Sequence, residues 1–317
     1  MKKNNMLSKR YFLGAIILLM TFSSCKENKK KDAEDLETDE TAMETEEPFF
    51  KLSLAQWSIH KMIKNDSVDP YTFAEKAKNW GFSGLEYVSQ LYPADLEDNE
   101  YSPEAMATFV EKSNAEAKKH GVQNVLIMID GQGNLAVSDD AERKAAVERH
   151  YKWVDAAAAL GCHSIRVNLN GESDPEKWHA NSVDGLTQLS TYAKTKNINV
   201  IVENHGSLSS NGAWLAEVMK GVALDNCGTL PDFGNFYVAK KRPNTTEDQW
   251  KAMQEKWSGD PYQEDEKGIY YDRYQGIKDL MPFAKGVSAK SHDFDEEGNE
   301  KYTNFTKAMR AVKASGY

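Results

Sequence analysis

Two carboxylates and one imidazole stand at the ends of apolar segments, where side chains of this kind could bind a metal ion. The segment INVIVENHG (198–206) is typical of a buried strand, yet it ends in Glu203 and His205. Asp232 ends another apolar segment, within LPDFGN. A buried carboxylate is costly unless a cation or hydrogen-bond donors pair with it. Carboxylate oxygens and imidazole suit Mn²⁺, Mg²⁺ or Zn²⁺, and a bound cation would lower the cost of burying Glu203 beside Asp232.

Other strand-like segments carry polar side chains with the same alternation. Alternate residues of a barrel strand face the lumen, and those at its carboxyl end line the site. Glu86 or Arg166 could each belong to an ordinary ion pair, and His60 could lie on the surface. Together, however, these residues indicate one polar site built from several strand ends. The set comprises Gln56, Ser58, His60, Glu86, Arg166, Asn168, Asn170, Ser288, Lys290 and His292.

The segments that would position these residues alternate between short apolar strands and amphipathic helices. The expected strands are 51–60, 84–89, 122–130, 163–171, 198–206, 228–236 and 285–295. The expected helices include 69–81, 102–121 and 140–161, with Asp or Ser at their starts and Gly at their ends. Repeated strand–helix units predict a parallel α/β sheet, and a TIM (β/α)₈ barrel fits best. A doubly wound open sheet is disfavoured because no glycine fingerprint follows the first strand.

The stretch 237–271 interrupts this alternation. It is polar and carries Trp250 and Trp257 seven residues apart. We expect a helical insertion from the sixth strand–helix loop, on the face where barrel sites lie. It could serve as a substrate lid or as a partner surface, and the two tryptophans are more typical of packing than of a binding platform.

The first 48 residues have the composition of an export signal and a tether. Residues 1–25 combine a basic start, a short apolar stretch and the ending FSSC, which resembles a bacterial lipobox with Cys25 as the lipidated residue. Residues 26–48 are densely charged and without apolar periodicity, so they predict a disordered tether. We expect an exported protein, lipid-anchored to a membrane and facing the periplasm or cell surface. An ordinary secretory signal with an incidental cysteine is the alternative.

The remaining composition, from residue 49 to 317, is globular. The formal net charge of −10 argues against nucleic acid as a partner, since phosphate-backbone binding needs a basic face. Cys162 and Cys227 remain after the signal, and buried free thiols are the expected state.

The segments VIVENHG, LPDFGNF and GVSAKSHDFD resemble the fifth, sixth and seventh strand ends of the xylose isomerase-like TIM-barrel superfamily. That superfamily contains sugar phosphate isomerases and epimerases and the endonuclease IV type of repair enzyme. The resemblance covers about residues 50–317. It implies that Glu203 and Asp232 are metal ligands and that Glu203 is also a catalytic base. It further implies a divalent metal ion that polarises a sugar carbonyl and stabilises an enediolate.

The sequence departs from the family pattern at two places. Ser288 stands where the seventh strand usually supplies a ligand, so Lys290, His292 or His205 could take over. The positive charge of Lys290 suits an enolate or sugar oxygen rather than a metal. The chain also ends at Tyr317, where an eighth strand with a second glutamate would begin. We expect either a fragment or a barrel that lacks this strand, and a fragment is favoured.

These observations predict a metal-dependent isomerase or epimerase that acts on a sugar or keto-sugar. Glu203, Lys290 and His205 are the expected catalytic residues. The expected metal ligands are Glu203, Asp232, His205 and His292. The expected substrate-binding residues are His60, Glu86, Arg166, Asn168 and Asn170. A non-catalytic sugar-binding lipoprotein and a keto-glycoside lyase or hydrolase remain as alternatives, and a DNA-repair enzyme is disfavoured because it would need a basic groove.

Overall fold

The computed structural model describes residues 49–241, 243–257 and 268–317. The signal segment with Cys25, the tether and a part of the 237–271 stretch lie outside the described residues.

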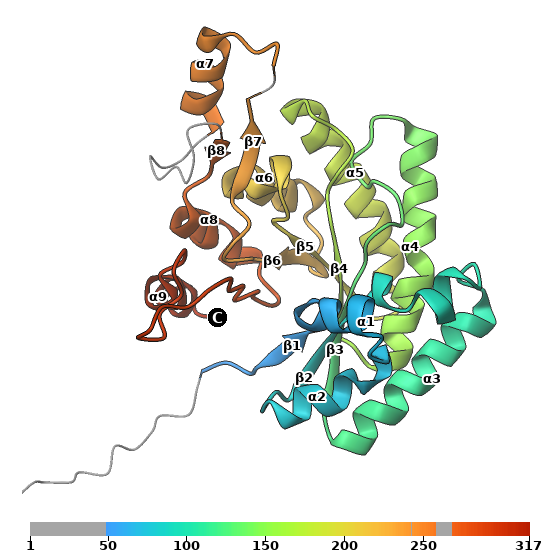
Figure 1. Ribbon diagram of the computed structural model, residues 1–317. Helices are drawn as coiled ribbons and strands as arrows, with labels where there is room; N and C mark the ends of the chain where they lie inside the picture. The colour runs from blue at the N-terminus through green and yellow to red at the C-terminus, as the bar shows by residue number, and fades with distance from the viewer. Residues whose placement is uncertain (1–48, 242, 258–267) are drawn as a thin grey trace, which may run out of the picture. The chain divides into compact units, whose positions relative to one another are not determined.

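Six strands form one parallel sheet in which each strand pairs with the next along the chain (Figure 1). The strands are β1 (Ser53–Ala55), β2 (Gly84–Val88), β3 (Gln123–Met128), β4 (Ser164–Val167), β5 (Asn199–Glu203) and β6 (Cys227–Leu230). The helices between and after them are α1 (His60–Asp66), α2 (Phe73–Asn79), α3 (Pro103–His120), α4 (Asp140–Leu160), α5 (Pro175–Lys194), α6 (Gly212–Val222), α8 (Arg273–Leu280) and α9 (Phe305–Ala314). This alternation is that of a TIM barrel, so the predicted fold class is confirmed.

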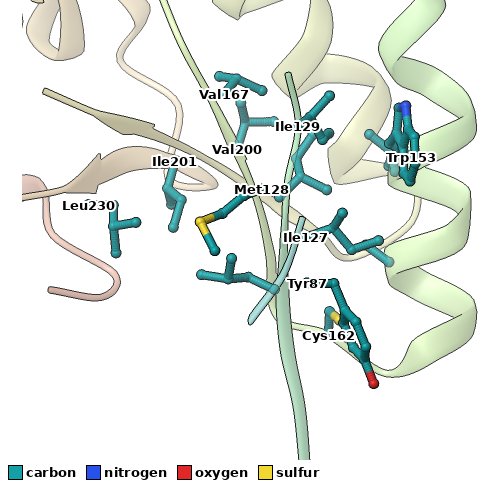
Figure 2. Packing of buried hydrophobic residues seen from close by; sticks show 14 of the residues in the cluster. Tyr87, Ile127, Met128, Ile129, Trp153, Cys162, Val167, Val200, Ile201 and Leu230 are labelled. Carbon is teal, nitrogen blue, oxygen red and sulfur yellow. The ribbon is translucent and has the colours of Figure 1, made fainter. Parts of the chain in front are cut away.

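Register and side-chain alternation give the sheet a lumen face and a helix face. Met128, Arg166, Ile201 and Gly228 are successive partners across β3 to β6 and therefore share one face. Figure 2 shows Met128 and Ile201 on one side of the sheet, with Ile127 on the side of Trp153 from α4. The apolar contacts on both faces hold the strand ends in fixed positions.

The long helices begin and end at the expected signals. The side chain of Asp139 caps α4 by accepting a hydrogen bond from the Glu142 amide at 2.8 Å, and Gly161 ends the helix with φ 74°. Ser102 caps α3 in the same manner. These caps satisfy amide groups that would otherwise lack a partner in the first turn of each helix.

The predicted seventh strand, 285–295, does not form a regular strand. It lies beside β6 through two single parallel bridges, Thr229 with Ala284 and Asp232 with Ser288. Backbone hydrogen bonds from Ser288 to Pro231 (2.8 Å) and from Phe233 to Ser288 (3.0 Å) fix it there. Small and polar residues alternate along this segment and offer little apolar surface on either face, so packing does not enforce a continuous ladder.

The stretch 237–271 differs from the helical insertion that we expected. It contains an antiparallel pair, β7 (Tyr237–Lys240) and β8 (Gly268–Tyr270), together with α7 (Glu247–Trp257). Trp250 is buried in a small cluster with Val238 and Ile269, which is the packing role expected for it. The β-branched and aromatic residues of the two strands favour pairing over helix.

Two further observations concern the membrane and the thiols. In the three described ranges, no helix has the length and apolarity needed to cross a membrane. Cys162 and Cys227 are buried free thiols, as predicted.

Candidate functional site

Glu203 is the last residue of β5, and its buried carboxylate is held by two neighbours. Asn235 Nδ2 donates a hydrogen bond to Glu203 Oε1 at 3.0 Å. Arg166 Nε lies 2.9 Å from Glu203 Oε2, which makes a buried ion pair. The Nε–H of Arg166 makes no well-aligned hydrogen bond among the described residues, so its contact with Glu203 is an ion pair without hydrogen-bond geometry. The guanidinium thus faces the Glu203 carboxylate inside the barrel and places a positive charge beside it.

Arg166 is positioned by the end of the neighbouring strand. Its Nη1 donates to Asp130 Oδ1 at 3.1 Å and to Asn168 Oδ1 at 3.2 Å. Asn168 Nδ2 donates to the same Asp130 oxygen at 2.6 Å. Asp130 was not among the predicted site residues, although it ends the apolar segment 122–130 just as Asp232 ends its own. Its strand-end position was the signal that could have revealed it.

Asp232 is almost completely buried, at 1% exposure. Its Oδ2 accepts a hydrogen bond from Ser288 Oγ at 2.7 Å, and its Oδ1 accepts one from the Gly234 amide at 2.8 Å. Burial and the nearby charge of Glu203 raise the pKa of Asp232 to about 6, against the opposing effects of Lys290 and these hydrogen bonds. Two carboxylates thus share one poorly solvated site. Carboxylates with pKa values perturbed in this way are common at catalytic and binding sites.

Lys290 and Asn235 connect the two carboxylates. Lys290 Nζ lies 3.9 Å from Asp232 Oδ2 and donates a hydrogen bond to Asn235 Oδ1 at 3.2 Å. Asn235 therefore binds Glu203 with its amide nitrogen and Lys290 with its oxygen. The ammonium group is about one-third exposed, so it can reach a ligand from the solvent side.

Asn204, which follows Glu203, joins the fifth and sixth strand ends. Its fully buried side chain donates to the carbonyls of Asp232 (3.0 Å) and Asn235 (2.9 Å) and accepts from the Asp232 amide at 2.7 Å. The sequence analysis missed Asn204 and Asn235. Both belong to the quoted motifs ENHG and DFGN, which were the available signal.

His205 lies in a sharply turned loop directly after these residues. Gly206 has φ 85° and Ser207 has φ 55°, and the amides of His205 and Gly206 donate to the hydroxyls of Ser209 and Ser210. Partial desolvation, followed by the charges of Arg166 and Lys290, lowers the pKa of His205. The His205 residue is nevertheless exposed to solvent, so it can exchange protons with water.

The remaining predicted residues lie at different depths. Glu86 lies deeper in the barrel, where desolvation raises its pKa and the charge of Arg166 acts against that shift. His292 is exposed, yet its Nε2 and Asp232 Oδ1 both lie close to Gly234. A Cβ atom at that glycine would be 3.2 Å from the imidazole nitrogen and 3.4 Å from the carboxylate oxygen. Asn170 is exposed beyond β4. His60 is outside the carboxylate group and stacks on Trp57 at 4.3 Å.

The donor set fits a hard divalent cation better than a soft one. Among the described residues, no three His, Cys, Asp or Glu side chains gather into a metal-binding cluster, so His205 and His292 are not grouped with the carboxylates. Glu203 and Asp232 supply oxygens only, as does the neighbouring Ser288. Mg²⁺ commonly binds through one or two carboxylates and completes its shell with water and substrate oxygens, whereas Zn²⁺ prefers four tetrahedral ligands rich in nitrogen or sulfur.

Comparison with known proteins places this chain in a family. The chain matches the family described as xylose isomerase-like TIM barrel over residues 74–317. No functionally curated protein gives a significant match.

Several solved structures share the fold at low sequence identity. A D-tagatose 3-epimerase-like protein superimposes with a TM-score of 0.56 at 16% identity, over 84% of this chain and 88% of that chain. A 3-keto-D-glucoside 4-epimerase from E. coli gives 0.53 at 15% identity, over 77% and 82%. A xylose isomerase-like TIM barrel protein from Mycobacterium smegmatis in complex with magnesium gives 0.51 at 14% identity, over 77% of each chain.

Proposed function

Because the chain belongs to the xylose isomerase-like TIM barrel family, we propose that it is a sugar isomerase or epimerase that moves a proton on a sugar or keto-sugar. The observation that carries the proposal is the buried pair Glu203 and Asp232 at adjacent strand ends, faced by Arg166 and Lys290. Such a group combines a base with positive charge at the place where a barrel site is expected.

Glu203 is the proposed base. Its carboxylate would take the proton from a carbon next to the substrate carbonyl, and the electron pair of the broken C–H bond would pass to the carbonyl oxygen. Arg166 pairs with the Glu203 carboxylate, and Asn235 orients it through a hydrogen bond. Return of that proton to the former carbonyl carbon, with transfer of the hydroxyl proton to the former carbonyl oxygen, gives isomerisation. A different proton delivered to the opposite face of the same carbon gives epimerisation, and Glu203 then releases its own proton to solvent. We assign His205 as the acid for that delivery because it is exposed to solvent and near enough to interact with the charges of Arg166, Lys290 and Asp232.

The negative charge that develops on the substrate oxygen needs positive partners. Lys290 supplies an ammonium group beside Asp232, and Arg166 supplies a buried guanidinium beside Glu203. Fixed donors in a poorly solvated site stabilise developing charge strongly, because they need not reorganise during the reaction. Asn168, which accepts from Arg166 and donates to Asp130, would hold the guanidinium in place beside the substrate. Asn170, His60 and Glu86 stay proposed substrate-binding residues.

We assign Glu203 and Asp232 as the residues that hold a divalent metal ion, Mg²⁺ or Mn²⁺, and keep His292, which lies beside Gly234 as Asp232 does, as a proposed further ligand. When bound, such an ion polarises the substrate carbonyl as a Lewis acid. The magnesium complex of the Mycobacterium smegmatis protein, which shares the fold, supports this assignment.

A turnover screen tests the proposed function. Purified full-length protein with added Mg²⁺ or Mn²⁺ is incubated with aldoses, ketoses and keto-sugars, and products are resolved by NMR. We expect at least one sugar to be converted by the native protein, and Glu203→Gln to lower kcat by at least about 10³. No conversion of any sugar, or full activity of the variant, would overturn the proposal.

A sugar-binding protein without turnover is the second candidate. It is favoured by Ser288, which stands at the family's ligand position and hydrogen-bonds to Asp232. Binding of a sugar without any conversion in the same screen would select it over the enzyme. The keto-glycoside lyase or hydrolase would instead release a free sugar from a keto-glycoside.

We also propose that the protein is exported and anchored through lipid on Cys25. The support is the sequence of residues 1–25. Expression in a bacterium followed by membrane fractionation tests it. The native chain should fractionate with membranes and carry a lipid mass increment, and Cys25→Ala should remove both.

A further inference from the structure

A cavity open to solvent lies beside segments that continue from the carboxylate site. It has a volume of about 900 Å³ and is lined by residues that follow β4, β5 and β6. Its walls include Ser207 and Leu208 from the 3₁₀ turn η5 (Ser207–Ser210), residues of β7, and one face of α7. Figure 1 shows α7 joined to the barrel through β7 and β8. None of the predicted site residues lines this cavity.

Two short stretches of chain connect the cavity to the carboxylates. Ser207 follows Glu203 by four residues, and Tyr237 follows Asn235 by two. Consecutive Cα atoms are 3.8 Å apart, so the Cα of Tyr237 lies within about 7.6 Å of that of Asn235. The turn η5 also packs directly against β7. Because Asn235 also hydrogen-bonds to Glu203, the lining residues Ser207 and Tyr237 lie on the two segments that continue from the carboxylate site.

The cavity walls combine aromatic and hydrogen-bonding side chains. Tyr237 and Trp257 present rings, while Ser207, Thr245 and Gln249 present hydroxyl and amide groups. A sugar ring has C–H groups on its faces and hydroxyl groups around its edge, so it needs both kinds of partner. Among the described lining residues, Lys240 alone carries a formal charge, which suits a neutral ligand.

The aromatic wall is held in place from behind. The Trp257 ring packs edge-to-face on Trp214 with ring centres 5.5 Å apart, and Asn211 Nδ2 donates to the Trp257 carbonyl at 3.3 Å. A preordered ring loses little conformational freedom when a ligand stacks on it. The volume lies near the upper end of the range for small-molecule sites, roughly 300–1,000 Å³, so it exceeds the needs of a single sugar ring.

We propose that this cavity is a second sugar subsite, and that the substrate of the Glu203 site is a glycoside with at least two sugar rings. The inference rests on the proposed function for the identity of the reacting ring. The second ring would lie between Tyr237 and Trp257, with its hydroxyl groups toward Gln249 and Ser207. Its binding energy would hold the reacting ring beside Glu203.

Binding of disaccharides tests the subsite independently of turnover. Isothermal titration of the full-length protein compares cellobiose, maltose, trehalose and sucrose with glucose. We expect at least one disaccharide to bind at least about tenfold more tightly than glucose. Trp257→Ala should abolish that gain by removing the aromatic wall, and Ala252→Trp should abolish it by filling the cavity.

The matched control is Trp80→Ala, which removes an exposed tryptophan just before β2, at the amino end of the sheet. It should leave the gain unchanged. The subsite is refuted if no disaccharide binds more tightly than glucose, or if the gain survives in both cavity variants. A gain that depends on Trp257, without conversion of any sugar, would refute the proposed function and keep the subsite. Conversion of free sugars without tighter binding of any disaccharide would refute the subsite and keep the proposed function.

Discussion

Asn204 shows how a neutral side chain can support a charged site. It makes three hydrogen bonds to the backbone of the Asp232 segment while fully buried. Replacing it removes partners from one amide and two carbonyls that water cannot reach, and each unsatisfied buried group costs about 1–3 kcal/mol. The geometry of Asp232 relative to Glu203 therefore depends on a residue that contacts no substrate.

Asn204→Ala should lower the free energy of unfolding by about 2–4 kcal/mol, because it leaves several buried polar groups without partners. Urea denaturation followed by circular dichroism measures the change. Asn79→Ala, at an exposed position in the last turn of α2, is the matched control and should change stability by less than about 0.5 kcal/mol. Equal stability of both variants would contradict the bridging role of Asn204.

His150 predicts a pH dependence of stability at the residue scale. Burial lowers its pKa to about 4, from an ordinary value of 6.5, although its Nδ1 pairs with the Ala146 carbonyl. Between these two values the unfolded chain binds more protons than the folded chain, so stability falls as pH falls from about 6.5 to 4. His150→Gln should remove roughly 3 kcal/mol of that decline. Parallel pH profiles for the native protein and the variant would contradict this assignment.

At the scale of elements, the helix ends and the strand ends follow from local sequence. Asp139→Ala should destabilise the protein by about 1 kcal/mol, because the variant leaves the Glu142 amide at the start of α4 without its partner. Thermal unfolding measures this change, and Glu148→Ala on the exposed face of the same helix serves as control. The cap has no role if both variants melt at the native temperature.

The sequence predicts some elements better than others, for physical reasons. The first six strands and the helices are recognisable because apolar periodicity and caps are local properties. The first strand was predicted too long, however: it ends at Ala55, Gln56–Ile59 form a 3₁₀ turn and His60 begins α1, so Gln56, Ser58 and His60 do not alternate along a strand. The segment 285–295 resembles a strand by alternation, but its position is set by single bridges to β6 that local pattern does not encode. In the same way, pairing of β7 with β8 joins residues far apart in sequence across α7.

The same distinction holds for the site. Glu203, Asp232 and Arg166 were predictable because a charge at the end of an apolar strand is unusual. Asn204 and Asn235 stand in the ENHG and DFGN motifs, but the motifs do not reveal their roles, which lie in contacts between separate strand ends. Whether His205 and His292 act as metal ligands or acids stays a prediction.

At the scale of the whole molecule, the charged side chains of the candidate site come from segments that are far apart in the sequence. Glu203 and Asp232 come from neighbouring strand ends, whereas Lys290 arrives from a segment more than fifty residues later. Lys290→Met should lower kcat for the converted sugar by about 10²–10³, because it removes a fixed positive charge from the site. Lys278→Met, on the exposed face of α8, should leave kcat unchanged. Equal activity of the two variants would exclude Lys290 from charge stabilisation.

Metal binding is also a property of the assembled site. Glu203→Ala and Asp232→Ala should each abolish stoichiometric binding of Mn²⁺ to the full-length protein, since each removes one of two proposed ligands. Titration followed by electron paramagnetic resonance counts the bound ion, and Asp225→Ala at an exposed ion pair is the control. Retention of the ion by both site variants would show that it binds elsewhere.

The central claim is that Glu203 exchanges a proton with a sugar carbon. The most direct measurement is deuterium incorporation from D₂O into a converted sugar, observed by proton NMR. We predict loss of the proton signal at the carbon beside the carbonyl with the native protein, and its retention with Glu203→Gln. Conversion of the sugar without any deuterium incorporation, or exchange that continues at the native rate in Glu203→Gln, would contradict the account.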